Sequence, residues 1–180
     1  MAGLSVAAPD GPDDIDAAAA RSARLIVVGS DADLAAVLTR LLRTDRLDVE
    51  VAHAVGWWSA RRARVGSATR VPLIRDDSGQ VIVRSAEWRG ADGDALHGEA
   101  VVDDTVLFDG EVVGVRIEPT YTMPGLRAAV SGGGRRRWSV GRAAQLGTTG
   151  ARVVRDGVEA PRIVRRSTFY RHTQGWLLVR

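Results

Sequence analysis

The stretch of residues 25–38 constrains the fold more than any other part of this sequence. Four apolar residues, 25–28, are followed by Gly29 and then by an amphipathic segment. This order predicts a buried strand, a tight glycine turn and the start of a helix. Such a turn directs backbone N–H groups at whatever lies above it, which favours an anion. The turn also contains Asp31 and Asp33, whose carboxylates repel a phosphate at that place.

The helix predicted after the turn is well defined. Ser30 or Asp31 is its expected cap. Its apolar residues follow the i, i+3, i+4, i+7, i+8 spacing and are Leu34, Val37, Leu38, Leu41 and Leu42. Residues 47–52 then alternate between apolar and acidic, which predicts a second strand. Strand, helix and strand form one β-α-β unit, expected to be parallel and right-handed.

Strand patterns dominate the remainder of the chain. Short apolar runs alternate with turn residues and predict hairpins over residues 71–88, 105–118 and 152–166, with turns at 75–79, 109–111 and 156–157, and a last strand at 175–179. Residues 106–112 and 153–159 resemble each other, each as a hairpin with Asp-Gly at its tip. The fold class is therefore α+β, with a short β-α-β unit packed on a larger antiparallel β-rich body.

The expected organisation has three parts. Residues 1–22, rich in Ala, Pro, Gly and Asp, predict a disordered tail. Residues 23–70 hold the β-α-β unit and 71–180 the β-rich body, together one compact domain over 23–180. No apolar run approaches the length of a membrane span, and the N-terminus lacks the pattern of a secretory signal. With no cysteine in the chain, these features predict a cytoplasmic location.

Every one of the 25 basic side chains is an arginine, a composition typical of GC-rich genomes. The absence of lysine and cysteine excludes Schiff-base chemistry, a Walker-type phosphate lysine, disulfides and thiolate nucleophiles or metal ligands. Arginine suits the forked, bidentate binding of carboxylate or phosphate. An anionic small molecule or nucleotide is therefore a chemically suitable partner.

The charges are distributed unevenly along the sequence. Acidic residues outnumber arginines between residues 75 and 111, whereas beyond residue 112 the acids are Glu118, Asp156 and Glu159. Two interpretations stay open. The acids of one part can face the arginines of the other, within one chain or across a homodimer. Alternatively, the arginine-rich half forms a basic face for an anionic partner such as nucleic acid.

The turn at residues 29–33 resembles the Gly-Gly-Asp-Gly-Thr turn of the superfamily that contains diacylglycerol kinases, sphingosine kinases and NAD kinases. The matching positions are Gly29, Asp31 and Leu34, and the departures are Ser30, Ala32 and Asp33. In that superfamily the turn lies against the nucleotide phosphates. The resemblance implies that Gly29, Ser30 and Asp31 contact a cofactor, with ATP and magnesium as the implied ligands.

A second resemblance involves residues 108–119, which are similar to the Asp-Gly-Glu segment in the β-domain of lipid kinases. It implies catalytic roles for Asp109 and Glu111, one of which takes the proton of the acceptor hydroxyl if the chain transfers phosphate. Two family features have no counterpart: a half-domain before the glycine turn and a Gly-Thr-x-Asn-Asp-type loop after it. The resemblance implies a shortened, degenerate relative that binds an anionic ligand or partner without efficient catalysis.

Other motifs give weaker indications. Trp57 and Trp58 precede three arginines, and residues 135–137 are three arginines followed by Trp138, so either segment is a candidate contact for a base or a phosphate. The three histidines are far apart in sequence, so no metal site is predicted. Besides the degenerate kinase-like domain, two alternatives remain: an interaction domain that forms a homodimer through acidic and basic faces, and an arginine-rich nucleic-acid-binding module.

Overall fold

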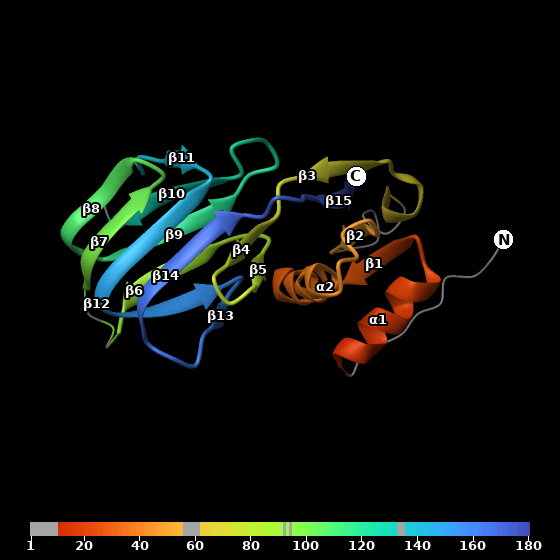
Figure 1. Cartoon of the computed structure of the whole chain (residues 1–180), viewed down its shortest axis with the longest axis horizontal. Helices are drawn as coiled ribbons and strands as arrows, with labels where there is room; N and C mark the ends of the chain where they lie inside the picture. Colours follow the sequence, from red (N-terminus) through yellow and green to blue (C-terminus); the bar gives the residue numbers. More distant parts are fainter. Residues whose placement is uncertain (1–10, 56–61, 92, 94, 133–135) are drawn as a thin grey trace.

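The computed structural model describes residues 11–55, 62–91, 93, 95–132 and 136–180. Within these residues the chain forms helices α1 and α2, a four-stranded sheet and a larger antiparallel sheet (Figure 1). The predicted α+β class is confirmed. No helix in the described ranges is long and apolar enough to cross a membrane.

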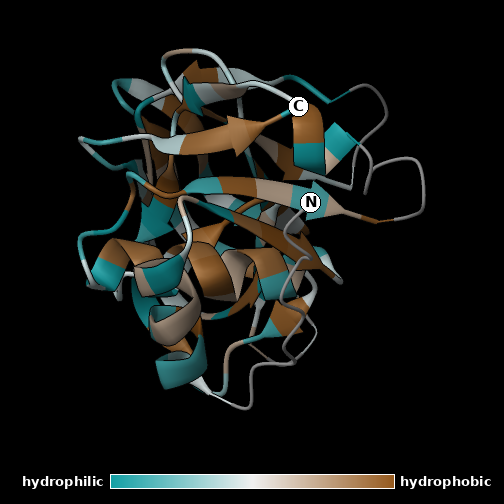
Figure 2. Cartoon of the chain, turned by 90° about the vertical axis from the view of Figure 1, so that its right-hand side faces the viewer, coloured by the Kyte–Doolittle hydropathy of each residue, from teal (hydrophilic) through white to brown (hydrophobic). Residues whose placement is uncertain are grey.

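The β-α-β unit forms as predicted. Strand β1 (Arg24–Val28) leads into α2 (Asp31–Arg43), and β2 (Glu50–Ala54) then pairs with β1 in parallel. Ser30 caps α2 by accepting a hydrogen bond from the backbone N–H of Asp33 at 3.2 Å. The apolar side of α2 is buried against the sheet, while its polar side faces outward (Figure 2). The core side chains of this unit include Leu34, Leu38 and Leu41.

The last strand of the chain belongs to this first sheet. Strand β15 (Trp176–Val179) pairs in parallel with β2, and β3 (Ala68–Val71) pairs with β15 in antiparallel fashion. The sequence predicted β15 but assigned it to the β-rich body, because an apolar run does not reveal its partner strand. The predicted strand over residues 71–74 is divided between the two sheets, since Pro72 has no N–H with which to continue the ladder.

Helix α1 (Pro12–Arg21) replaces part of the predicted disordered tail. Pro12 at the first helical position, acidic residues in the first turn and a run of four alanines favour a helix. Ala19 is buried in the core, and Asp16 forms an ion pair with Arg40 of α2. The composition of this segment, rich in alanine and aspartate, therefore reflects a docked helix over residues 12–21 rather than disorder.

The β-rich part forms two layers around one core. Its strands are β4 (Ile74–Asp76), β5 (Val81–Ile82), β6 (Ala86–Gly90), β7 (Leu96–Val102), β8 (Thr105–Val112), β9 (Gly114–Pro119), β10 (Leu126–Ser131), β11 (Ser139–Gly141), β12 (Ala143–Arg155), β13 (Val158–Glu159) and β14 (Val164–Arg171). The long β12 joins the layers: residues 144–148 pair with β7, residues 151–155 pair with β6, and the register shifts between Gly147 and Ala151. The rings of Trp88 and Phe169 meet in the core with centroids 5.9 Å apart.

The two Asp-Gly pairs have different structures. Asp156 and Gly157 form the predicted turn between β12 and β13, with φ values of 47° and 87°. Asp109 and Gly110 instead lie inside β8, so the predicted hairpin over residues 105–118 is wrong. Strand β8 pairs with β7 across a turn at residues 103–104, and β9 pairs with β6 and β10. Strand β8 can continue through Gly110 because Gly98 lies opposite it on β7, so that no side chains meet at this position of the ladder.

Candidate functional site

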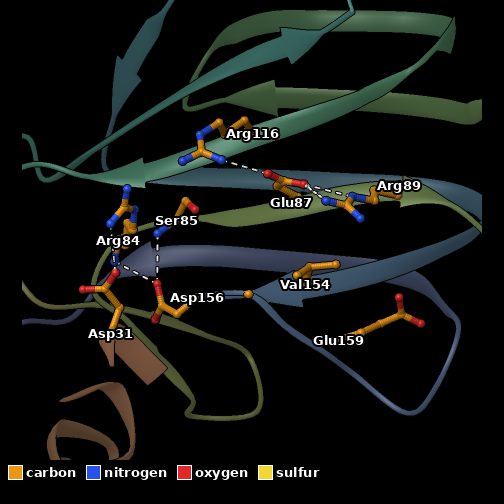
Figure 3. Close-up of a pocket in the computed structure, with 10 residues that line it drawn as sticks. Asp31, Arg84, Ser85, Glu87, Arg89, Arg116, Val154, Asp156 and Glu159 are labelled. Atoms are coloured by element: carbon orange, nitrogen blue, oxygen red, sulfur yellow. Dashed lines mark hydrogen bonds and ion pairs between the residues drawn. The ribbon is translucent and has the colours of Figure 1, made fainter. Parts of the chain in front are cut away.

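A pocket of about 460 Å³ lies where the N-terminus of α2 meets the β-rich part (Figure 3). Its residues come from α2, β6 and the segment before it, β9, and the β12–β13 hairpin with its turn. They are Asp31, Arg84, Ser85, Glu87, Arg89, Arg116, Val154, Asp156, Gly157 and Glu159. The pocket therefore brings Asp31 of the predicted glycine turn together with the turn at Asp156 and Gly157.

The polar groups of the glycine turn at residues 29–33 are hydrogen-bonded to one another. The Asp33 carboxylate accepts hydrogen bonds from the Ser30 backbone N–H and hydroxyl, each at 2.7 Å. These bonds hold the pKa of Asp33 below its ordinary value. A Cβ on Gly29, where φ is +155°, would lie 2.5 Å from the same carboxylate. Asp33 therefore takes up the Ser30 N–H group within the turn, and its negative charge opposes a phosphate at that place.

Asp31, the first residue of α2, faces the pocket. One carboxylate oxygen lies 3.2 Å from a guanidinium nitrogen of Arg84, and the other lies 3.9 Å from Nδ1 of His53. The other ring nitrogen of His53 is 2.9 Å from the carbonyl oxygen of Gly29. Of the predicted cofactor residues, Asp31 thus lines the pocket, whereas Ser30 caps the helix and Gly29 shapes the turn.

Asp156 lies beside Asp31 in the pocket (Figure 3). Its carboxylate accepts hydrogen bonds from the backbone N–H groups of Val83 at 3.0 Å, Arg84 at 2.8 Å and Ser85 at 2.9 Å. Burial raises the pKa of Asp156 above its ordinary value; the three N–H donors oppose that shift and the nearby negative charge of Asp31 adds to it. Both carboxylate oxygens are engaged by the backbone, so this side chain acts as a brace for residues 83–85.

Arg84 is the most accessible cation of the pocket, with 72% of its side chain exposed. The other two arginines are more firmly held by acids. Glu87 bridges Arg89 and Arg116, with the Arg116 contact at 2.8 Å. Arg84 is therefore the cation of the pocket that solvent and dissolved anions reach most easily, whereas the neighbouring Ser85 is buried.

The network of charges continues from the pocket across β9 and β10. Arg116 also binds Glu118 at 2.7 Å, and Glu118 binds Arg127 at 2.7 Å. Burial raises the pKa of Glu118, but the hydrogen bonds and positive charges of Arg116 and Arg127 outweigh it, so the pKa lies below its ordinary value. Along this face, acids and arginines are paired within one chain, as one of the sequence interpretations proposed.

We expect this pairing to contribute to acid sensitivity. The pKa of Glu118 is lower in the folded than in the unfolded chain. Its contribution to the stability of the fold is therefore fully present above the pKa of the unfolded chain, and it is lost as the pH falls through the pKa of the folded chain. The free energy of unfolding of the Glu118→Gln variant should therefore depend less on pH than that of the wild type between about pH 5 and pH 3. Urea titrations over that range measure the free energy of unfolding of both proteins. Identical pH profiles for the variant and the wild type would contradict the prediction.

Asp109 and Glu111 do not line this pocket. Both are exposed on β8, which Figure 1 shows at the opposite end of the molecule from α2. Asp109 lies opposite Glu99 on β7, and Glu111 is 3.6 Å from a ring nitrogen of His97. The structure thus separates the two halves of the predicted site, and the catalytic role of these carboxylates stays a prediction.

Of the ten residues that line the pocket, the sequence interpretation selected only Asp31 as a site residue, and Asp156 and Gly157 are among those that it missed. The likeness between residues 106–112 and 153–159 was the available signal, since it marked two candidate Asp-Gly segments. Trp57, Trp58, Arg61 and Arg135 of the other motifs lie outside the described residues. Trp138 packs against Arg127, with the guanidinium carbon 4.3 Å from the ring centroid. The described ranges contain no group of three or more His, Asp or Glu residues placed to hold a metal ion.

Comparisons with known proteins identify the class of fold. No protein-family model matches the sequence, and no curated protein matches it. Among solved structures, an NAD kinase from Archaeoglobus fulgidus in complex with ATP superposes with a TM-score of 0.61 at 12% identity, over 96% of this chain and 90% of that one. A diacylglycerol kinase from Bacillus anthracis str. Sterne gives a TM-score of 0.69 at 12% identity, over 96% and 82%. The chain has the fold of NAD kinases and diacylglycerol kinases, the superfamily that its motifs resemble.

Proposed function

We propose that this chain is a degenerate domain of the diacylglycerol and NAD kinase fold, which binds an anionic small molecule without efficient phosphoryl transfer. The proposal rests on one observation: the polar groups that would act on a phosphate are bonded to other groups of the same chain. Asp33 occupies the N-terminal end of α2, and the Asp156 carboxylate is bound to three backbone N–H groups. The three backbone donors hold the Asp156 carboxylate against residues 83–85, so this side chain is used to position the chain.

Ligand binding is supported by the arrangement around Arg84. Its guanidinium is exposed, and its partner within the described residues is Asp31, at 3.2 Å. A guanidinium so placed can bind a carboxylate or phosphate in bidentate fashion. The Ser85 hydroxyl lies beside it in the pocket wall. The remaining arginines are neutralised by acids, so we assign recognition of the anion to Arg84.

Calorimetric titration with phosphate, ATP, ADP and NAD, each with and without magnesium, tests the proposal. We expect at least one of these anions to bind, and the Arg84→Ala variant to lose affinity by about tenfold or more, since charge-assisted hydrogen bonds are lost. Asp31→Asn should tighten binding, because it releases Arg84 from its acidic partner. Absence of binding by every probe would overturn the assignment.

Two further measurements sharpen this experiment. Arg43→Ala, an exposed arginine at the far end of α2, is the matched control and should bind as the wild type does. Turnover of ATP with either a diacylglycerol or NAD as the acceptor measures catalysis directly. Phosphoryl transfer at about 1 s⁻¹ or faster, the range of ordinary kinases, would overturn the non-catalytic part of the proposal.

A further inference from the structure

The charges in the lining of the pocket do not cancel one another. The lining includes four acids and three arginines, namely Asp31, Glu87, Asp156 and Glu159 against Arg84, Arg89 and Arg116. Two of these arginines, Arg89 and Arg116, are both paired with Glu87. Glu159 is paired at 2.7 Å with Arg152, which is not part of this lining. The third arginine of the pocket therefore remains with the other two acids.

Asp31 and Asp156 are these two acids, and they lie next to each other beside Arg84 (Figure 3). Asp31 accepts a hydrogen bond from the Arg84 guanidinium at 3.2 Å. The Asp156 carboxylate has no ion-pair partner among the described residues, and its hydrogen bonds come from backbone N–H groups. Burial and, to a smaller extent, the negative charge of Asp31 raise the pKa of Asp156, so the two carboxyl groups repel each other. One guanidinium thus serves two carboxylates.

The ring of His53 does not supply the missing positive charge at neutral pH. Its Nε2 lies 2.9 Å from the carbonyl oxygen of Gly29, and a carbonyl oxygen only accepts, so Nε2 carries the proton of the neutral ring. The unprotonated Nδ1 then faces Asp31 at 3.9 Å. This contact brings no cation to the carboxylate.

A purely anionic ligand increases the imbalance of charge. A guanidinium has five N–H donors, so an anion can bind Arg84 beside Asp31 or in its place. In both arrangements one positive charge faces the ligand as well as Asp31 and Asp156. A charge that leaves water without a partner is costly. Tight binding at this place therefore favours a ligand that brings a positive charge of its own.

We propose that the ligand of this pocket is a small zwitterion, in which a short chain joins a phosphate or carboxylate group to an ammonium group. The anionic group binds the Arg84 guanidinium, and the ammonium group binds the Asp31 carboxylate. The ammonium offsets the negative charge that the ligand adds to the pocket. This inference rests on the proposed function, because it requires that Arg84 bind an anion, and it restricts the ligand to compounds with both charges.

Calorimetric titration with matched pairs of compounds tests the inference, at about pH 8, where histidine is largely neutral. Phosphoethanolamine and hydroxyethyl phosphate differ by an ammonium in place of a hydroxyl group, and β-alanine and its hydroxyl analogue differ in the same way. We expect the ammonium compound of at least one pair to bind about tenfold more tightly than its analogue, since a charge-assisted contact is added. The pair with this preference identifies the anionic group as phosphate or carboxylate.

The Asp31→Asn variant separates the two contacts of the ligand. The hydroxyl analogue should bind the variant more tightly than the wild type, because Arg84 is released from its acidic partner. The ammonium compound loses its own partner, so the preference should disappear. A damaged fold would weaken both compounds instead. Asp48→Asn removes an exposed acid outside the pocket, and this matched control should keep the wild-type preference.

The possible failures are distinguishable. Binding of phosphate, a nucleotide or a hydroxyl analogue without preference for an ammonium compound would overturn the inference and leave the proposed function standing. Absence of binding by every anion and every zwitterion would overturn both. A preference that persists in Asp31→Asn would contradict the assignment of the ammonium group to Asp31.

Discussion

Replacing Asp76 by alanine should cause the largest loss of stability of any single charged residue. Asp76 has no exposed surface, yet both of its carboxylate oxygens have hydrogen-bond partners. One carboxylate oxygen accepts from the Ser78 backbone N–H at 2.9 Å and the Gln80 backbone N–H at 2.8 Å, and the other binds Arg155 at 2.6 Å. Removal leaves the half-buried Arg155 unpaired, which costs about 3–5 kcal/mol. Urea unfolding measures this loss of free energy, and thermal unfolding should show a fall in Tm of about 10 °C for a chain of this size.

The adjacent Asp77 provides a matched control. Its side chain is exposed, so Asp77→Ala should change the free energy of unfolding by no more than about 0.5 kcal/mol. The pair of variants separates the buried network from a general effect of removing one negative charge. A small loss of stability in Asp76→Ala would show that the network contributes little, because β4 and β14 remain held by their ladder.

Local sequence patterns predicted the individual helices and strands better than they predicted which strands pair with one another. The β-α-β unit followed from the apolar spacing of α2 and its cap at Ser30, both of which depend on residues near in sequence. The place of β15 did not follow, because the strand contributes apolar side chains that fit either sheet. Long strand β12 was also underestimated, since its bend at residues 147–151 allows one strand to serve two layers.

The candidate site was predicted only in part, again because local sequence patterns do not show which distant segments come together. Asp31 was selected because its turn resembles the Gly-Gly-Asp-Gly-Thr turn, and the strand and helix expected on either side of that turn are present. The hairpin predicted at Asp109 and Gly110 was wrong because an Asp-Gly pair is compatible with a turn or with a strand interior. Which of the two structures forms depends on the neighbouring segment. Gly110 lies opposite Gly98 within the β7–β8 ladder, whereas the Asp156 carboxylate accepts hydrogen bonds from the backbone of residues 83–85. No sequence pattern encodes that tertiary contact.

Asp156→Ala should weaken both the fold and ligand binding. The substitution removes the acceptor for the backbone N–H groups of Val83, Arg84 and Ser85, and it places alanine at a φ of 47°. Orphaned donors and left-handed backbone together cost roughly 3 kcal/mol. The segment that carries Arg84 then loses its brace, so the affinity of the phosphate or nucleotide probe should fall as well.

Two further substitutions at this position separate its two roles. Asp156→Gly relieves the backbone conformation but still removes the acceptor, so it should recover about 1 kcal/mol of stability and no ligand affinity. Asp156→Asn keeps one acceptor oxygen and tolerates a positive φ, so it should recover part of both. Unfolding in urea and calorimetric titration of the same three variants give the comparison. If Asp156→Ala keeps wild-type affinity, the position of Arg84 does not depend on Asp156, and the brace has no part in binding.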